Sequence, residues 1–285
     1  MGHPILVTGA PGNVSTEIVR LLREQGETVR AAVYNVAKAR QVLGEGIEYA
    51  AFDFERPETY AAALQGVKRF YLMRPPQITD TRRLINPVID AAKAAGVEQI
   101  VFLSLMGADK NKFVPHAKVE EHLLTAGVPY TLLRPTYFMQ NLTSVYGNWI
   151  RQHGELPIPT GQGKTSWIDA RDIAAVAARV LTSDGHGNKA YTLTGSEALS
   201  FGTVAQIMSE ELGRPIRWQN PGYLEYRRKM KGAGLQAGLI NITTIMYLII
   251  RFGMSETLTS TTQDLLGRPP LTMRQFVRDH AGVWK

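Results

Sequence analysis

Short apolar runs rich in β-branched and aromatic residues alternate, over the first half of the chain, with segments of helical periodicity. The runs predict buried parallel strands, because such strands are apolar on both faces. The segments between them place apolar residues three or four positions apart, which predicts helices. We expect strands over residues 5–8, 28–33, 47–52, 67–73, 99–104 and 130–134, and helices from near residue 13 and over residues 57–64, 79–95 and 115–126.

This alternation of strands and helices predicts an α/β fold with a doubly wound parallel sheet and right-handed crossovers. The pattern loses its regularity in the second half. There we expect a loop over residues 161–164, a helix over 168–181 entered through Asp169 and Asp172, a strand over 189–194, and helices over 201–212 and 235–252. The chain therefore divides into a doubly wound domain over residues 1–155 and a smaller substrate-covering lobe over residues 156–285, interleaved with the last sheet strands.

Residues 235–252 form the most apolar stretch of the second half. Gln236, Asn241, Thr243 and Thr244 interrupt it, and it is shorter than the ~20 predominantly apolar residues that span a bilayer. We therefore expect a buried or pocket-lining helix and no membrane association.

Composition narrows the functional classes. The chain has 285 residues, a formal net charge of +7 and no cysteine, which excludes disulfides, thiol nucleophiles and cysteine-ligated zinc. The densest basic cluster, residues 227–231, accompanies no DNA-binding motif, so we expect a solvated helix face and no nucleic-acid partner. Part of the charge would suit a phosphate-rich small molecule. Because the first residues run into a strand without a secretory signal, we expect a cytoplasmic protein.

The turn between the first strand and the first helix points to a ligand. The strand stops at Gly9, and the chain turns through Pro11 and Gly12 before a helix begins near Asn13. Gly9 allows a tight turn, Gly12 lets the backbone approach a pyrophosphate, and the unpaired N–H groups of a helix start bind anions. Ser15 stands where the usual fingerprint has a third glycine, and it is also small. The turn predicts a dinucleotide phosphate site, and the alternative is a purely structural turn.

The end of the second strand predicts which dinucleotide is bound. An Asp or Glu at this point would bind a ribose 2′-hydroxyl and repel a 2′-phosphate. Tyr34 and Asn35 stand there instead, and Lys38 and Arg40 follow within the next turns. We therefore expect NADP, with NAD still possible.

Residues at the ends of the third and fourth strands are also expected to line this site. Asp53 and Phe54 close the third strand, where a carboxylate and an aromatic ring suit an adenine amino group and ring. The alternative is that Asp53 caps the helix expected over residues 57–64. Pro75 follows the fourth strand and would border the cofactor cleft without continuing any element.

Several motifs, taken together, give the chain a resemblance to a known family. They are Thr8-Gly9-Ala10-Pro11-Gly12, Asp53-Phe54 and residues 115–124, 127–135, 138–142 and 169–174, in the right order over most of the chain. On these motifs the sequence resembles the NmrA-like group of atypical short-chain dehydrogenases/reductases. The resemblance implies that residues 1–155 form a Rossmann-type NAD(P)-binding domain. Members that prefer NADP often carry Arg where this chain has Tyr34. The candidate coenzyme contacts are Thr8, Gly9, Pro11, Gly12, Asn13, Val14, Tyr34, Asn35, Lys38, Asp53, Phe54, Met73, Arg74, Pro75, Ser104, Lys118, Pro135 and Tyr137.

One departure from the wider group bears on the chemistry. Ordinary short-chain dehydrogenases use a Tyr-x-x-x-Lys pair, in which the lysine lowers the pKa of the tyrosine so that it can remove a proton from an alcohol. Here Val114 stands four residues before Lys118, so the tyrosine is absent. Reduction of a plain ketone then lacks its proton donor, whereas an electron-poor conjugated acceptor delocalises the arriving charge. We expect an NAD(P)H-dependent reductase of a quinone-like or dye-like acceptor. The alternative is a catalytically silent, NAD(P)-sensing regulator of the NmrA type that binds a protein partner.

Five residues are candidates for direct roles at the acceptor. Lys118 would hydrogen-bond the nicotinamide ribose and lend positive charge. His116 would donate a proton to the reduced product, the alternative being a helix-cap or surface role. Phe138 and Trp149, with Tyr137, would form a stacking surface for a flat aromatic substrate, or else belong to the core.

Residues 120–122, Glu-Glu-His, invite a metal-site interpretation. Adjacent positions on a helix face different ways, so we expect a solvated helix face and no metal. For assembly, we expect a monomer or a homodimer.

Overall fold

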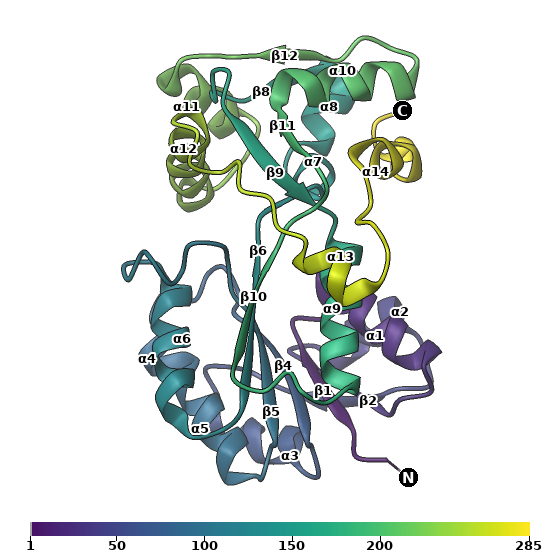
Figure 1. Ribbon diagram of the computed structural model, residues 1–285, viewed down its shortest axis with the longest axis vertical. Coiled ribbons are helices and arrows are strands. Elements are labelled where there is room, and N and C mark those ends of the chain that lie inside the picture. The colour runs from purple at the N-terminus through teal and green to yellow at the C-terminus, as the bar shows by residue number, and fades with distance from the viewer. Residues whose placement is uncertain (1) are drawn as a thin grey trace. The chain divides into compact units, whose positions relative to one another are not determined.

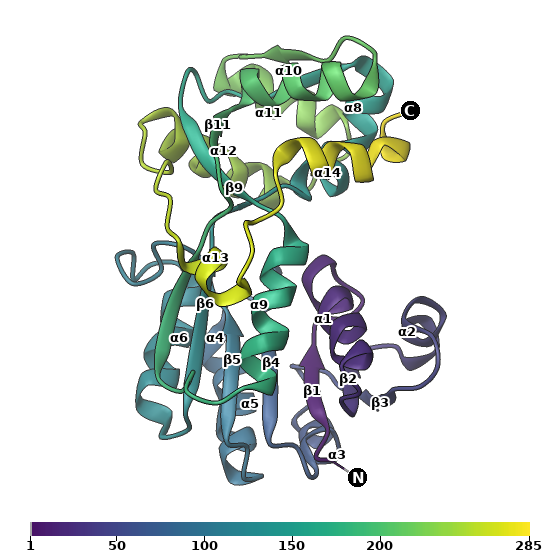
Figure 2. The same cartoon turned by 45° about the vertical axis from the view of Figure 1, so that its right-hand side comes forward.

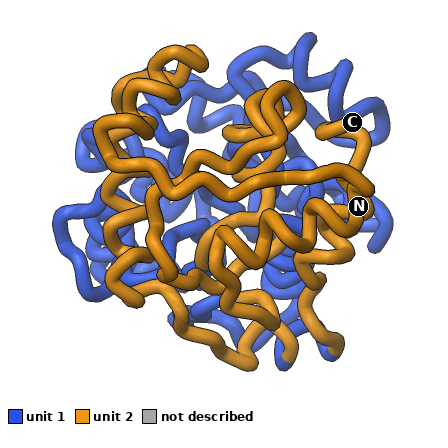
Figure 3. Tube along the Cα trace, turned by 90° about the horizontal axis from the view of Figure 1, so that it is seen from above, with its two compact units in different colours: residues 1–135, 170–193, 264–267 blue, residues 136–169, 194–263, 268–285 orange. Residues whose placement is uncertain are grey.

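The computed structural model describes residues 2–285, which form two compact units (Figure 3). Unit 1 contains residues 2–135, 170–193 and 264–267. Unit 2 contains Thr136–Asp169, Thr194–Gln263 and Arg268–Lys285. Each unit is therefore discontinuous in sequence, because residues 170–193 return to unit 1 and complete its sheet. The sequence-based division, residues 1–155 and a lobe over residues 156–285 interleaved with the last sheet strands, stays a prediction.

Unit 1 is built on a seven-stranded parallel sheet with the order β10-β6-β5-β4-β1-β2-β3 (Figure 1). This confirms the expected doubly wound α/β fold. The strands are β1 (Ile5–Thr8), β2 (Val29–Val33), β3 (Glu48–Ala51), β4 (Arg69–Met73), β5 (Gln99–Leu103), β6 (Tyr130–Pro135) and β10 (Lys189–Leu193).

The direction of strand order reverses at β1. From β1 the chain proceeds outward through β2 and β3, and then crosses to the other side of β1 to form β4, β5 and β6. Ile5 of β1 accordingly pairs with Val29 on one side and Arg69 on the other. Such a reversal opens a crevice outside the carboxyl ends of the strands, where ligands bind in folds of this type.

Helices cover both faces of this sheet (Figure 2). One face carries α1 (Asn13–Glu24), α2 (Val36–Leu43) and α9 (Ala170–Thr182), with α1 packed along α9. The other carries η1 (Pro57–Thr59), α3 (Tyr60–Leu64), α4 (Thr81–Leu84), α5 (Asn86–Ala94) and α6 (Pro115–Ala126). Between sheet and helices, residues such as Leu6, Leu72, Phe102, Ile89 and Val119 are completely buried.

The single helix expected over residues 79–95 is wrong. The structure has α4 and α5 instead, separated at Ile85. Pro87 lies in the first turn of α5, where its missing N–H costs nothing, and it would break a helix interior. The proline therefore restarts the helix.

Unit 2 contains two small sheets and several helices. One sheet joins β7 (Tyr137–Phe138), β9 (Lys164–Ile168) and β11 (Ala198–Ser200), and the other joins β8 (Glu155–Pro157) and β12 (Arg217–Gln219). The helices are α7 (Asn141–Ser144), α8 (Gly147–His153), α10 (Phe201–Leu212), α11 (Tyr223–Gly232), α12 (Ala237–Arg251), α14 (Met273–Asp279) and η2 (Ala281–Val283), and α13 (Thr261–Leu266) spans a unit boundary. Strand β9 corrects the expectation of a helix from residue 168, because α9 begins only at Ala170.

Helix α12 accounts for the apolar stretch near residue 240. Ile240, Tyr247 and Ile250 are buried, whereas Ile242 and Ile245 on the opposite side are more than half exposed. None of the helices within residues 2–285 combines the length and the apolar character required to cross a membrane.

Candidate functional site

The turn between β1 and α1 requires glycine at two positions. Gly9 has φ +78°, and a β-carbon placed on it would lie 2.4 Å from Cε of Met73. A β-carbon on Gly12 would lie 2.6 Å from the carbonyl oxygen of Gly9. A side chain at Gly9 would be strained by the left-handed backbone and would displace the end of the Met73 side chain, whereas a side chain at Gly12 would meet backbone and force the turn apart.

The start of α1 is suited to an anion. Gly12 is its N-cap, no side chain caps it, and its first turn contains no acidic residue. The bond from Thr16 N to Gly12 O is the first of the helix, so the preceding N–H groups, those of residues 13–15, have no partner within the helix. These amides and the helix dipole make a positive end beside the turn.

Two small polar side chains hold this turn in place. The hydroxyl of Ser15 donates to the carbonyl of Thr8 at 2.8 Å, which packs α1 closely on β1. The hydroxyl of Thr8 donates to Tyr71 O at 3.0 Å and accepts from Met73 N at 2.9 Å. Thr8 is fully buried, so its side chain joins β1 to β4 and does not line a pocket.

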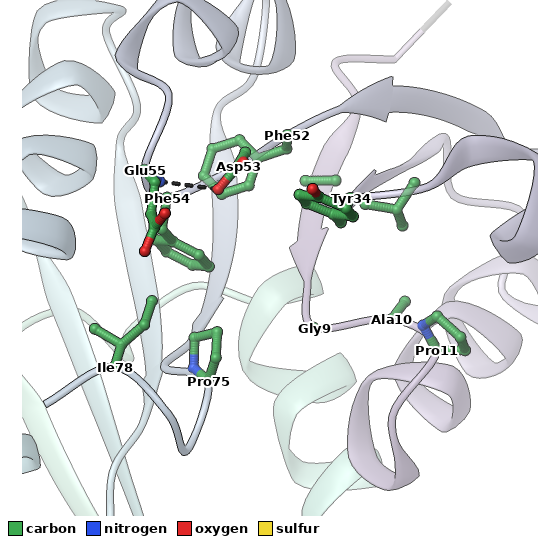
Figure 4. A pocket seen from close by; sticks show the side chains of 12 residues that line it. Gly9, Ala10, Pro11, Tyr34, Phe52, Asp53, Phe54, Glu55, Pro75 and Ile78 are labelled. Carbon is green, nitrogen blue, oxygen red and sulfur yellow. Dashed lines mark hydrogen bonds between the residues drawn. The ribbon is translucent and has the colours of Figure 1, made fainter.

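A pocket of about 390 Å³ lies at this turn and at the carboxyl ends of β2 and β3 (Figure 4). Phe54, Pro75 and Ile78 gather on one side of it in this view, and Tyr34 and Pro11 on the other. The pocket brings together six of the residues expected from the sequence, namely Gly9, Pro11, Tyr34, Asp53, Phe54 and Pro75. It adds residues that the sequence did not single out, namely Ala10, Ala32, Val33, Phe52, Glu55 and Ile78.

Local contacts position Asp53 and Phe54 in the loop after β3. A carboxylate oxygen of Asp53 accepts from Glu55 N at 2.9 Å, as the dashed line in Figure 4 shows. The ring of Phe54 packs edge-on against Phe52, with centroids 5.0 Å apart. The N-cap of the following helix η1 is Arg56, so the alternative in which Asp53 caps that helix is wrong.

The polar side chains after β2 differ in whether they already have partners within the protein. Asn35 accepts from Lys38 N at 2.9 Å and so caps α2, a role that the sequence interpretation missed. Arg40 is paired with Glu45 at 2.6 Å and lies over the ring of Tyr49. The Lys38 side chain is exposed. Of the two cations expected to meet a 2′-phosphate, Arg40 is therefore already engaged.

Arg74 organises the loop after β4. Its Nη1 donates to the carbonyl oxygens of Pro75 at 2.8 Å, Pro76 at 3.2 Å and Ile78 at 2.6 Å. Burial lowers the pKa of the guanidinium, and its Nε is enclosed without a hydrogen-bond partner among residues 2–285. Arg74 thus fixes the segment through which Pro75 and Ile78 line the pocket.

Helix α6 carries His116 and Lys118, with Val114 as its N-cap. Lys118 is exposed. Burial, with the nearby charge of Arg74, lowers the pKa of His116 to about 3, and its Nδ1 has no partner within the described part of the chain. The imidazole is therefore uncharged near neutral pH and lacks the acidic proton that the expected donor role requires. The helix-cap alternative is wrong, because Val114 occupies the N-cap position.

Glu120 of this helix belongs to a buried ionic network. The hydroxyl of Ser104 donates to Glu120 Oε1 at 2.5 Å, and Arg134 donates to both carboxylate oxygens, at 3.0 Å from Nε and 2.7 Å from Nη2. Glu120 is 3% exposed and Ser104 is 4% exposed. The expected solvated face over residues 120–122 is therefore wrong at Glu120 and right at Glu121, which is exposed. No group of His, Asp and Glu side chains in residues 2–285 is arranged to hold a metal ion.

The remaining expected contacts do not line the pocket. Pro135 is buried at the end of β6, where its carbonyl accepts from Met106 N at 2.9 Å. Tyr137 is buried in the core of unit 2, with its ring 4.8 Å from that of Trp167 and its hydroxyl 3.3 Å from that of Tyr247. Phe138 and Trp149, also in unit 2, are half-buried, and Trp149 packs against the same core.

A parallel sheet with reversed strand order, a glycine turn, an uncapped helix start and a pocket at the carboxyl ends of the strands define a Rossmann-type dinucleotide-binding domain. Comparison with known families agrees with the resemblance seen in the sequence. The chain belongs to the NmrA-like family, whose model matches residues 1–241.

Relatives are similar over nearly their whole length. The chain is 36% identical over 284 residues to an NAD(P)H azoreductase of Xenophilus azovorans, covering 98% of this chain and 99% of the relative. Its structure is similar to that of an NADPH-dependent quinone oxidoreductase from Escherichia coli complexed with NADPH, with a TM-score of 0.87, 28% identity, and coverage of 96% and 99%. It is also similar to a Citrobacter sp. triphenylmethane reductase complexed with NADP(H), with a TM-score of 0.86, 27% identity, and coverage of 98% and 99%.

Proposed function

We propose that this chain is an NAD(P)H-dependent oxidoreductase that reduces an electron-poor conjugated acceptor, such as a quinone or an aromatic dye. The observation that carries the proposal is the glycine turn with its uncapped helix start, which opens on the pocket between β1, β2 and β3. The names of the relatives, an azoreductase, a quinone oxidoreductase and a triphenylmethane reductase, support the acceptor class.

The residues present fit NADP(H). Gly9 and Gly12 allow the tight turn that places the start of α1 at the pocket, where its amides are available to a pyrophosphate. Asp53 and Phe54 supply a carboxylate and an aromatic face for an adenine within the pocket. Exposed Lys38 can pair with a ribose 2′-phosphate. Two of the structurally similar proteins were solved with this coenzyme, which supports NADP over NAD.

When bound, the reduced coenzyme supplies a hydride to the acceptor. The chain's own residues contribute orientation and charge. Lys118, which is exposed, would hydrogen-bond the ribose beside the nicotinamide, and Arg74 holds the loop between β4 and α4 that lines the pocket. Val114 and the uncharged His116 leave this region without a ready proton donor. An acceptor that spreads the arriving charge over a conjugated system, and takes its proton from water, suits such a site.

The experiment mixes the purified protein with NADPH or NADH and a panel of quinones, azo dyes and triphenylmethane dyes, and follows coenzyme absorbance. We expect turnover on at least one acceptor class, and a loss of turnover in Lys118→Ala. The matched control is Lys68→Ala, because Lys68 lies before β4 at the opposite end of the sheet and pairs with Glu98. Coenzyme binding without turnover on any acceptor would contradict an enzyme and favour the dinucleotide-sensing regulator.

A further inference from the structure

The network around Glu120 joins four segments of unit 1. Ser104 directly follows β5, Glu120 lies on α6 and Arg134 lies near the end of β6. Asp109, in the loop between β5 and α6, lies 3.4 Å from the same guanidinium. The side chain of Arg134 is 15% exposed and that of Glu120 is 5% exposed. The network therefore fixes the position of Ser104 relative to the helix that carries Lys118.

The network also fixes the direction of the Ser104 hydrogen bond. Both oxygens of Glu120 accept from the guanidinium of Arg134, which has only donors. The hydroxyl of Ser104 has one proton, and that proton is directed at Glu120 Oε1. Charge-assisted bonds of this kind are among the stronger ones in proteins. Toward any other partner, Ser104 Oγ is therefore left as an acceptor.

Ser104 stands where the second half of a dinucleotide would lie. The pocket occupies the β2 and β3 side of the point at which strand order reverses. A dinucleotide lies across that point, so its nicotinamide half extends over the carboxyl ends of β4 and β5. Ser104 is the residue immediately after β5.

We propose that Glu120 and Arg134 are positioning residues that present Ser104 Oγ as a hydrogen-bond acceptor to the carboxamide amino group of the nicotinamide ring. The inference rests on the proposed function. The donors on that half of the coenzyme are the ribose hydroxyls and the carboxamide N–H groups. The ribose hydroxyl oxygens can accept from Lys118, whereas the carboxamide amino group can only donate and needs an acceptor. Holding the carboxamide fixes the orientation of the nicotinamide ring. It therefore determines which face of the ring meets the substrate that takes up the hydride.

The test compares NADP with its 3-acetylpyridine analogue, in which a methyl group replaces the carboxamide amino group. Titration of the wild-type protein should give an analogue Kd about five to ten times that of NADP, the value of about one net hydrogen bond. In Ser104→Ala the two dissociation constants should become equal. This variant leaves the Glu120–Arg134 pair intact, so the protein is expected to fold.

The positioning role is tested with the double variant Glu120→Leu/Arg134→Met, which removes both charges together and avoids leaving one buried alone. Without its acceptor, the Ser104 hydroxyl is free to donate to the carbonyl oxygen that both ligands carry, so the ratio of the two dissociation constants should fall toward that of Ser104→Ala. Ser15→Ala is the matched control, because Ser15 donates to Thr8 at the other half of the site and should leave the ratio unchanged. A general loosening of the fold would weaken both ligands equally and leave the ratio at its wild-type value.

An unchanged ratio in Ser104→Ala would overturn the proposed contact, whether or not affinity falls. An unchanged ratio in the double variant would overturn the positioning role of Glu120 and Arg134. If the wild-type protein bound neither dinucleotide, the proposed function itself would fail. Equal binding of both by the wild-type protein would leave that function standing and remove only this inference.

Discussion

The side chain of Met73 fills the space beside the α-carbon of Gly9, so that a β-carbon on Gly9 would lie 2.4 Å from Met73 Cε. Gly9 directly follows β1 and Met73 ends β4, and these strands are neighbours in the sheet. The contact therefore lies at the point where strand order reverses. The contact couples the conformation of the turn between β1 and α1 to the position of β4.

Gly9→Ala tests this relationship. The substitution combines an unfavourable left-handed backbone with close contacts to the Met73 side chain and to Ser15, so we expect coenzyme affinity to fall about tenfold and stability to fall by about 2 kcal/mol. Gly26→Ala is the matched control, because Gly26 has φ +80° and a β-carbon there meets nothing within 4 Å. It should lose only about 1 kcal/mol and bind coenzyme normally. Urea unfolding and coenzyme titration measure both variants, and equal losses in the two would contradict the role of Met73.

Coenzyme preference should depend on Lys38. We expect Lys38→Ala to weaken NADPH binding about two- to fivefold, the range of an exposed ion pair, and to leave NADH binding unchanged. Arg40→Ala is the control, because that guanidinium is already paired with Glu45. Titration of both coenzymes at low and high salt measures the effect, since salt screens exposed charges. Equal NADPH affinity in Lys38→Ala and the wild-type protein would remove Lys38 from the site.

Much of the fold was predictable from the sequence because local patterns determine it. The apolar strands of unit 1 are buried on both faces, and runs such as residues 99–103 indicate this directly. Strand β9 was missed because its middle residues, Thr165 and Ser166, are polar yet fully buried. Their hydroxyls bond Ser255, 90 and 89 positions away, and no local pattern indicates so distant a partner.

In the candidate site, too, features with a local sequence signature were predictable, and features that depend on distant partners were not. The glycine turn and the residues near Asp53 were predictable, since strand ends and turns carry local signatures. The burial of Glu120 was not, because its partner Arg134 lies on another element and Ser104 on a third. A glutamate beside a second acidic residue on a helix indicates a solvated face until the facing strand is known.

The half-buried imidazole of His116, with its Nδ1 enclosed, predicts a loss of stability in acid. Its pKa is lowered to about 3 in the folded state, against about 6.5 when unfolded. Above about pH 6.5 neither state is protonated and the group has no effect, whereas between these values only the unfolded state takes up the proton. Stability should therefore fall by up to about 1.4 kcal/mol per pH unit below about pH 6.5.

His116→Gln should reduce that acid sensitivity. Urea unfolding at about pH 7.5 and about pH 5 measures the difference between the variant and the wild-type protein. His122→Gln is a suitable control, because His122 is paired with Asp90 at 2.8 Å, whereas His116 Nδ1 is enclosed without a partner among the described residues. The pH–rate profile of the wild-type protein should show no titration of His116 between about pH 5 and 8. A titration step that is present in the wild-type profile and absent in His116→Gln would contradict the uncharged imidazole.

A cluster of tyrosine hydroxyls in unit 2 predicts the opposite sensitivity, to alkali. The hydroxyl of Tyr146 bonds those of Tyr226 and Tyr247, and Tyr137 lies 3.3 Å from Tyr247. Burial raises the pKa of Tyr137, Tyr146 and Tyr247 above the usual value near 10. Above about pH 10 the unfolded state loses protons that the folded state keeps, so stability is present below that pH and is lost as pH rises through it.

Tyr247→Phe separates the hydroxyl from the ring. We expect it to lower stability by about 1 to 2 kcal/mol at about pH 8, because Tyr137 and Tyr146 lose a buried partner. We expect it also to flatten the decline above about pH 10, because one fewer buried phenol titrates. Tyr34→Phe is the control, since Tyr34 is 83% exposed and should change neither quantity. Guanidinium unfolding across this pH range measures both effects. A variant that kept the full alkaline decline would show that the cluster does not titrate as a buried group.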